Sequence, residues 1–303
     1  MCYSLEMNRK RRLRILIGVL LFICVLAGAT LRSIMAASKY EFLQAYSHSP
    51  FLSSAFLAER EQLLKSWVYH EDGSITSADF SGAYYHVSNN RRLTPHQPSS
   101  AKHTLWLLGS STLYDFEVPD DYTIAANLQR MLPDYRVENL AEPGIDTERA
   151  IAILAKTDIR PGDIVVVYDG MNELAPVIKS ADKLPTAKRV YQRYRQAVIA
   201  GHAYALSHGA AWHHFMPPTI YSLHNDFERW LFADSRFPFP TANKDYAIFW
   251  PMLLATPFSV DLSHVLDSER DAGAEFFFDG GHMNDQADTI IARAIVDAIA
   301  PTF

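Results

Sequence analysis

The stretch LWLLGSSTL, residues 105 to 113, decides how the chain is interpreted. An apolar run over residues 105 to 108 stops abruptly at Gly109-Ser110-Ser111. A short apolar run that ends in a turn residue is typical of a strand buried in a sheet. Such a strand carries the residues that follow it to the edge of the sheet, where a serine hydroxyl can act as a nucleophile. Ser110 and Ser111 are therefore candidate nucleophiles.

From residue 103 onward, short apolar runs alternate with longer segments of helical periodicity. This alternation predicts an α/β fold, a three-layer sandwich with a doubly wound and mostly parallel sheet. We expect strands at 103–109, 135–141, 163–169, 212–216 and 274–278. We expect helices near 122–132, 147–156, 185–207, 221–234 and 284–299.

Polar motifs follow four of the expected strands, each at the carboxyl end. The carboxyl ends of parallel strands share one edge of a sheet, and α/β proteins bind their ligands at that edge. We therefore expect these motifs to form a single site. The motifs, in strand order, are Gly109-Ser110-Ser111-Thr112, Gly144, Gly170-Met171-Asn172-Glu173 and Asp279-Gly280-Gly281-His282.

These residue types suit acyl transfer. A serine hydroxyl needs a histidine to accept its proton, and the histidine needs a carboxylate to orient it and stabilise its charge. Asp279 and His282, three residues apart, can supply both groups from one turn. The negative charge that develops on the carbonyl oxygen needs fixed donors, for which we expect the backbone N–H groups of Ser111 and Gly144 and the side-chain amide of Asn172. This chemistry requires no cofactor and no metal, and we predict neither.

Taken together, the motifs resemble those of the SGNH, or GDSL-like, hydrolase superfamily of serine esterases and carbohydrate O-acyltransferases. The first block of that family reads Gly-Asp-Ser, so the resemblance implies that Ser111 is the nucleophile and that Ser110 replaces the aspartate. The block Asp-x-x-His is intact, which implies Asp279 and His282 as the acid and the base. The family fold is a flavodoxin-like three-layer sandwich, and the resemblance extends over roughly residues 103 to 300.

Two blocks depart from the family pattern. The second block, Asn-x-Gly-x-x-Gly in the family, keeps its last glycine at Gly144 but has Ala141 in place of the first. The third block, Gly-x-Asn-Asp, keeps Asn172 and ends in Glu173. The resemblance therefore implies an oxyanion hole formed by Ser111, Gly144 and Asn172.

The composition allows one sizeable domain and excludes nucleic acid as a partner. The chain has 303 residues, 49% of them hydrophobic, a formal net charge of −6 and a pI near 6.0. Basic residues cluster only near the N-terminus, so no basic surface for nucleic acid is expected. Cys2 and Cys24 are the only cysteines, which excludes a zinc–cysteine site in the folded domain.

The N-terminus indicates export. Five basic residues between 9 and 14 precede an uncharged run at 15–31. A helix of this length is roughly 26 Å long, marginal for spanning a bilayer. We expect residues 1–37 to be a cytoplasmic tail and a single-pass anchor that leaves the remainder in the periplasm. A cleavable signal peptide is the alternative, because Ala27-Gly28-Ala29 fits a cleavage site, and the domain would then be secreted.

Residues 38–102 form a stem and a lead-in to the catalytic domain, which we place at 103–303. Apolar residues at helical spacing predict a helix that packs on the domain or spaces it from the membrane; a partner-binding helix is the alternative. Its expected apolar face consists of Phe56, Leu57, Leu63, Leu64 and Trp67. Between residues 72 and 102 we expect irregular chain with at most one edge strand.

The sequence leaves several functions open. The first is an extracytoplasmic serine esterase or O-acyltransferase that acts on acyl esters of a cell-envelope or secreted polysaccharide through an acyl-enzyme at Ser111. We expect the acyl group to be acetyl. The partners would then be the acylated carbohydrate, the membrane and, for a transferase, a membrane protein that donates the acyl group. The alternatives are a catalytically silent domain for polysaccharide binding or secretion-complex assembly, and a lipid esterase.

Overall fold

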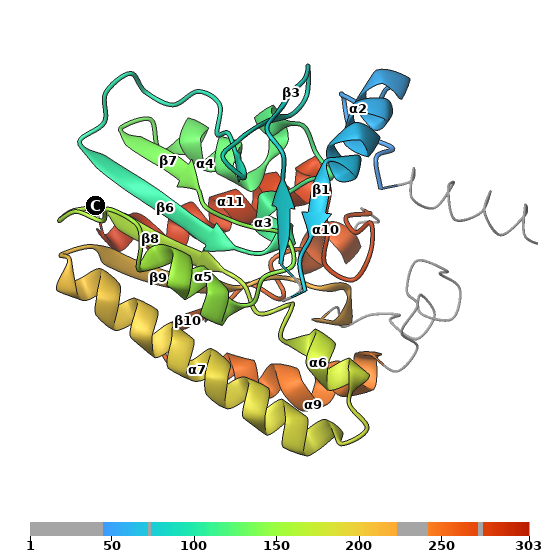
Figure 1. Ribbon diagram of the computed structural model, residues 1–303, viewed down its shortest axis with the longest axis vertical. Coiled ribbons are helices and arrows are strands. Elements are labelled where there is room, and N and C mark those ends of the chain that lie inside the picture. The colour runs from blue at the N-terminus through green and yellow to red at the C-terminus, as the bar shows by residue number, and fades with distance from the viewer. Residues whose placement is uncertain (1–44, 72–73, 223–241, 272–274, 303) are drawn as a thin grey trace, which may run out of the picture.

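A five-stranded parallel sheet forms the centre of the molecule (Figure 1). The computed structural model describes residues 45–71, 74–222, 242–271 and 275–302. From one edge of the sheet to the other, the strands lie in the order β7-β6-β8-β9-β10. Numbered by their order in the chain, this is 2-1-3-4-5, the flavodoxin-like arrangement. The predicted fold class is therefore confirmed. The strands are β6 (His103–Gly109), β7 (Tyr135–Asn139), β8 (Ile164–Tyr168), β9 (Ala211–Met216) and β10 (Ser259–Asp261).

Helices cover both faces of the sheet, as Figure 1 shows. One face carries α4 (Ile124–Met131) and α11 (Asp285–Ile299), which pack against each other. The other face carries four helices, α5 (Thr147–Leu154), α6 (Leu174–Lys179), α7 (Lys183–Ser207) and α9 (Ala242–Leu254). Of these, α7 packs against each of the other three.

The two inner strands β6 and β8 are mainly apolar because both of their faces are buried. Side chains alternate between the two faces of a strand. In β6, Leu105 and Leu107 belong to the hydrophobic cluster under α4 and α11, whereas Leu108 belongs to the cluster under α5 and α7. In β8, Val166 joins the first cluster and Val167 the second. The apolar run at residues 105–108 is therefore part of a strand that is buried between two layers of helices.

Capping side chains set where three of the helices begin. A side-chain oxygen at the N-cap accepts a hydrogen bond from a backbone N–H that would otherwise have no partner. Thr123 accepts from Ala126 N at 3.0 Å at the start of α4. Asp146 and Asn284 do the same for α5 and α11, at 3.0 and 3.1 Å.

Four of the five predicted strands are confirmed, and the fifth was wrong. Residues 275–278 contain no strand; Phe277 forms only an isolated bridge to Met283, and Phe278 N donates to His282 O. The apolar run at this position is buried because it lies in the core next to α11, in a tight turn rather than in the sheet. The fifth strand is β10, which the sequence analysis did not predict.

The helix predicted at 221–234 lies mostly outside the described residues. Ile220–Ser222 forms a single 3₁₀ turn, and α9 further along was not predicted. The remaining short helices are α3 (Ser111–Tyr114), α10 (Asp267–Asp271) and 3₁₀ turns at Asp120–Tyr122 and Ala300–Thr302.

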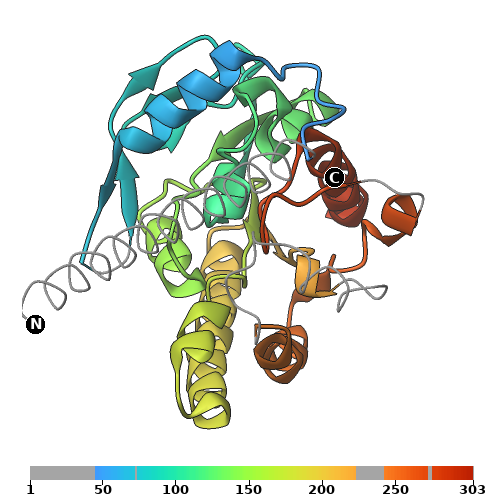
Figure 2. The ribbon, with the colours of Figure 1, turned by 90° about the vertical axis from the view of Figure 1, so that its right-hand side faces the viewer.

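The segment before β6 packs on the α/β sandwich; in Figure 2 it forms the blue-to-teal group at one side of the molecule. Helix α2 (Ser54–Lys65) buries Phe56 and Leu63 in the same cluster as β6, and Leu57, Leu64 and Trp67 pack against that cluster. The expected apolar face therefore packs on the domain.

Two small antiparallel sheets follow α2, where at most one edge strand was predicted. A turn at Asn89 and Asn90, both with positive φ, joins β4 to β5, and asparagine tolerates this backbone region better than most residues. The sheets consist of β1 (Trp67–Tyr69) with β2 (Ile75–Ser77), and of β3 (Phe80–Ser81), β4 (His86–Ser88) and β5 (Arg91–Arg92).

The predicted anchor at 15–31 lies outside the described residues. Within the described ranges, no helix combines the length and the apolar character needed to cross a bilayer.

Candidate active site

Ser111 follows strand β6, at its carboxyl end, as the first residue of α3. Gly109 makes this tight strand-to-helix connection possible, because a Cβ at that position would lie 2.3 Å from the carbonyl oxygen of Tyr168 in β8. The Ser111 side chain is partly exposed. Ser110 is fully buried, and its hydroxyl lies 3.5 Å from that of Thr112. Of the two candidate serines, only Ser111 reaches the edge of the sheet.

The structure brings Ser111, His282 and Asp279 together. His282 Nε2 lies 2.9 Å from Ser111 Oγ, and His282 Nδ1 lies 2.6 Å from Asp279 Oδ2. An ionised carboxylate can only accept, so Nδ1 carries the proton and Nε2 is left to accept the serine O–H. The three side chains therefore form a continuous path for a proton from Ser111 to His282.

The turn that carries Asp279 and His282 holds both side chains in place. Asp279 Oδ1 accepts hydrogen bonds from the backbone N–H groups of Gly281 and His282, each at 2.9 Å. Phe278 N donates to His282 O at 2.9 Å and closes the turn. Both oxygens of Asp279 are therefore used, one to shape the turn and one to orient the imidazole.

The electrostatics of this turn favour a charged histidine beside a charged aspartate. Enclosure in the protein opposes ionisation of Asp279, but the His282 imidazole and the hydrogen bonds outweigh it and lower the pKa of Asp279 to about 2. Burial also opposes the charged imidazole, yet Asp279, with Glu117 and Asp115, raises the pKa of His282 above 6.5. An imidazolium formed during reaction would therefore be stabilised.

These shifts predict a pH dependence. The free enzyme needs a neutral His282 to accept the serine proton, so kcat/KM should rise with pH to a plateau, with an inflection above 6.5. Asp279→Asn removes the negative partner and should move the inflection to lower pH while lowering kcat about 10⁴-fold. The measurement is the pH–rate profile of p-nitrophenyl acetate hydrolysis for both proteins. An unchanged inflection in Asp279→Asn would contradict this account of the pKa shift.

Gly144 and Asn172, the other predicted oxyanion donors, lie on two loops that are bound to each other. Asn172 Nδ2 donates to the carbonyl oxygen of Ile145 at 2.6 Å, directly after Gly144. Two residues further, Thr147 N donates to Glu173 Oε1 at 2.8 Å. Gly144 is exposed, and its φ of +78° lies in the left-handed region that favours glycine. The two loops therefore present Gly144 and Asn172 close together.

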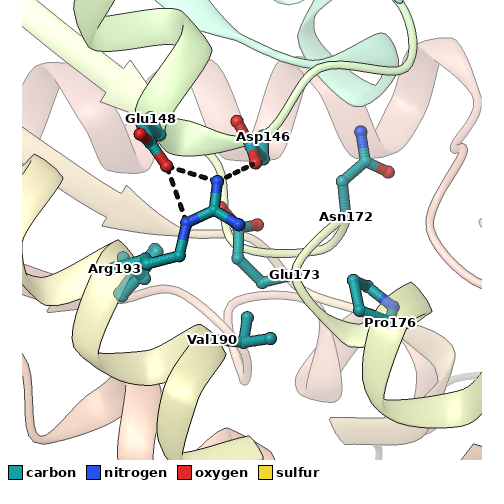
Figure 3. Close-up of a pocket in the computed structure, with 8 residues that line it drawn as sticks. Asp146, Glu148, Asn172, Glu173, Pro176, Val190 and Arg193 are labelled. Carbon is teal, nitrogen blue, oxygen red and sulfur yellow. Dashed lines mark hydrogen bonds and ion pairs between the residues drawn. The ribbon is translucent and has the colours of Figure 1, made fainter. Parts of the chain in front are cut away.

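A small pocket of about 50 Å³ opens beside Asn172 (Figure 3). Arg193 crosses it and pairs with Glu148 and, at 3.8 Å, with Asp146. Glu173 lies at its base and is buried, and burial raises the pKa of this carboxyl. Most of the lining residues are polar or charged, but the surface that they present to the pocket is mainly apolar. The lining consists of Asp146, Glu148, Asn172, Glu173, Pro176, Val190, Arg193 and Tyr194.

Two residues near His282, Phe116 and Asp115, were not predicted from the sequence to belong to the site. The ring of Phe116 lies 4.7 Å from the His282 ring, centroid to centroid. Asp115 ends α3 with a φ of +69° and accepts from Ile124 N at 2.9 Å. Burial raises the pKa of Asp115 to about 7, and its carboxyl group lies within hydrogen-bond reach of that of Asp288 in α11. No motif marks these positions, because they act through packing and charge brought in from separate elements.

Among the described residues, no group of three or more His, Cys, Asp or Glu side chains has an arrangement suited to a metal ion. His214, on β9, is buried and lies 2.8 Å from Ser259 Oγ through Nδ1, and burial lowers its pKa to about 3. That histidine is part of the core.

No protein-family model and no curated protein matches the chain. Solved structures do align with it. A lipolytic protein of the G-D-S-L family from Veillonella parvula DSM 2008 aligns over 65% of this chain and 98% of its own, with a TM-score of 0.45 and 14% identity. The carbohydrate acetylesterase Est24 from Sinorhizobium meliloti aligns over 67% and 100%, with a TM-score of 0.44 and 12% identity. The acetylxylan esterase Axe2 from Geobacillus stearothermophilus aligns over 66% of this chain and 95% of its own, with a TM-score of 0.43 and 17% identity.

Proposed function

We propose that this protein is a serine esterase that hydrolyses, or transfers, acetyl groups carried by a carbohydrate. The observation that carries the proposal is the hydrogen-bonded series Ser111–His282–Asp279, with distances of 2.9 and 2.6 Å. A serine, a histidine and a carboxylate in this order are the arrangement needed to activate a hydroxyl for attack on an ester. The series stands at the edge of the sheet where α/β proteins bind ligands.

The first half of the reaction forms an acyl-enzyme. Ser111 Oγ attacks the ester carbonyl carbon while its proton passes to His282 Nε2, and Asp279 stabilises the imidazolium that results. The tetrahedral intermediate then collapses: its bond to the alcohol oxygen breaks, and His282 returns the proton to that oxygen. The acyl group remains on Ser111 as an ester.

The second half regenerates the serine. Water, or a sugar hydroxyl in a transferase, gives its proton to His282 and attacks the acyl-enzyme carbonyl. When the second intermediate collapses, Ser111 Oγ leaves and recovers its proton from His282. In both halves the negative carbonyl oxygen is stabilised by the backbone N–H groups of Ser111 and Gly144 and by the Asn172 amide.

Charged side chains around the pocket beside Asn172 support a carbohydrate as the alcohol part of the substrate. Asp146, Glu148 and Arg193 offer acceptors and donors suited to sugar hydroxyl groups. The names of two of the aligned structures, a carbohydrate acetylesterase and an acetylxylan esterase, refer to the same class of substrate.

The location is proposed from the sequence at 9–31. It would place the domain outside the cytoplasm, on a single-pass anchor or secreted after cleavage, in contact with acetylated polysaccharides of the envelope. If the enzyme is a transferase, a membrane protein would supply the acyl group.

The test is a comparison of acyl chain length and acceptor. We expect the purified domain, from residue 38, to hydrolyse p-nitrophenyl acetate at least about 10-fold faster than the octanoate, and to release acetate from acetylated xylo-oligosaccharides. The reason is that the pocket of about 50 Å³ is too small for a long acyl chain, and the charged groups around it would lose water if the chain covered them. Mass spectrometry of an added unacetylated oligosaccharide would reveal transfer. Faster octanoate hydrolysis would favour a lipid esterase, and a folded protein inactive on every ester would favour a silent binding domain.

A further inference from the structure

The β1–β2 hairpin binds the loop that carries Gly144. The backbone N–H of Ile75, the first residue of β2, donates a hydrogen bond to the carbonyl oxygen of Pro143, with an N···O distance of 3.2 Å. Ile75 pairs with Tyr69 across the hairpin. In an antiparallel pair of strands, residue pairs that are hydrogen-bonded to each other alternate with pairs that are not. The neighbouring pair, His70 and Ser74, is hydrogen-bonded through His70 N and Ser74 O. The pair Tyr69–Ile75 is therefore not, and the Ile75 N–H points out of the hairpin.

The acceptor of this bond belongs to the same peptide group as the expected oxyanion donor. Pro143 O and Gly144 N are the two polar atoms of one planar unit. The described residues contain no cis peptide bond, so this C=O and this N–H point in opposite directions. A contact that fixes the direction of the carbonyl therefore also fixes the direction of the Gly144 N–H.

Gly144 needs such an external restraint. Glycine adopts positive and negative φ with similar ease, so its own backbone preference does not hold the peptide in one orientation. The chain after Gly144 is held by Asn172 at Ile145 O and by Glu173 at Thr147 N. The Ile75 contact holds the chain before it.

The hairpin is itself fixed to the active site. The Trp67 ring of β1 packs edge-on against the Phe116 ring, at a centroid distance of 5.0 Å and an angle of 84°. Phe116 in turn contacts the ring of His282. One face of the hairpin therefore supports the histidine, while its outer edge supports the oxyanion loop.

We propose that the Ile75 backbone N–H is a positioning group that orients the Gly144 N–H toward the developing oxyanion, so that the hairpin before the α/β sandwich is part of the active site. The inference rests on the proposed function for its effect on the rate. The contact between the hairpin and the loop does not depend on that function, and a physical measurement can test it separately.

The experiment compares variants that delete the N–H with one that keeps it. Ile75→Pro removes the N–H, as does replacement of the amide at position 75 by an ester, which retains the isoleucine side chain. Ile75→Ala shortens the side chain and keeps the N–H. We expect kcat on p-nitrophenyl acetate to fall about 10- to 100-fold in both N–H-deleted proteins, with KM within about twofold of the wild-type value. One oxyanion donor raises kcat by about 10²- to 10³-fold, and a donor that points in the wrong direction loses part of this contribution. Ile75→Ala should stay within about twofold.

The order parameter of the Gly144 N–H vector, measured by ¹⁵N NMR relaxation, is the second readout. We expect a lower order parameter, and so a more mobile peptide, in the two N–H-deleted proteins than in wild type and Ile75→Ala. Equal kcat and equal order parameters in Ile75→Pro, the ester variant and Ile75→Ala would overturn the inference. If wild type proves inactive on every ester, the proposed function fails, and the Gly144 order parameters alone decide whether the hairpin holds the loop.

Discussion

Ser111→Ala is expected to lower kcat for the hydrolysis of p-nitrophenyl acetate by about 10⁶-fold. A loss of this size is typical of a serine enzyme that has lost its nucleophile. The reason is that, among the described residues, Ser111 is the one whose hydroxyl hydrogen-bonds to the imidazole of His282. The Ser111 hydroxyl is the one found 2.9 Å from Nε2. The measurement is steady-state kinetics on purified protein, with the melting temperature recorded to show that the fold is retained.

Ser110→Ala is the matched control for this prediction. Ser110 is buried, and its hydroxyl faces Thr112. We expect its loss to lower kcat by less than about 10-fold, since it removes only a weak contact in the core. If Ser110→Ala abolished activity and Ser111→Ala did not, the nucleophile would be Ser110 and the arrangement of the site described above would be wrong.

His282→Ala is expected to lower kcat by a similar amount, again about 10⁶-fold, because the nucleophile and its base act as one unit and the loss of either disables both. His208→Ala is the control. His208 follows α7, at the opposite end of β9 from the strand ends that carry the site, and its Nδ1 contacts Tyr204 O. Kinetics of the two variants against wild type would show whether the effect is specific to the active-site imidazole. Comparable losses in both variants would contradict the role of His282.

Much of the fold could be predicted from the sequence because both faces of the sheet are buried. Strands such as β6 and β8 then become continuous apolar runs with sharp ends, and helix starts are marked by capping residues such as Asp146 and Asn284. The fifth strand could not be predicted in this way. Residues 276–278 are as apolar as a strand, but they are buried by α11, whereas β10 at the edge is short and partly exposed.

The candidate site could be predicted where a motif lies within one turn of chain. Asp279 and His282 are three residues apart, and their hydrogen bonds are local to that turn. The supporting contacts join distant parts of the chain. The bond from Ile75 to Pro143 and the packing of Trp67 on Phe116 link the segment before the sandwich to the active site. Neither periodicity nor spacing carries information about such pairs.

The most direct test of the central claim, that Ser111 is an activated nucleophile, is covalent labelling by a fluorophosphonate followed by peptide mass spectrometry. We predict that wild type gains one phosphonyl group, located on Ser111, and that Ser111→Ala and His282→Ala are not labelled, since attack needs both the hydroxyl and the base. A folded wild-type protein that takes up no label, or that carries it on another residue, would contradict the account.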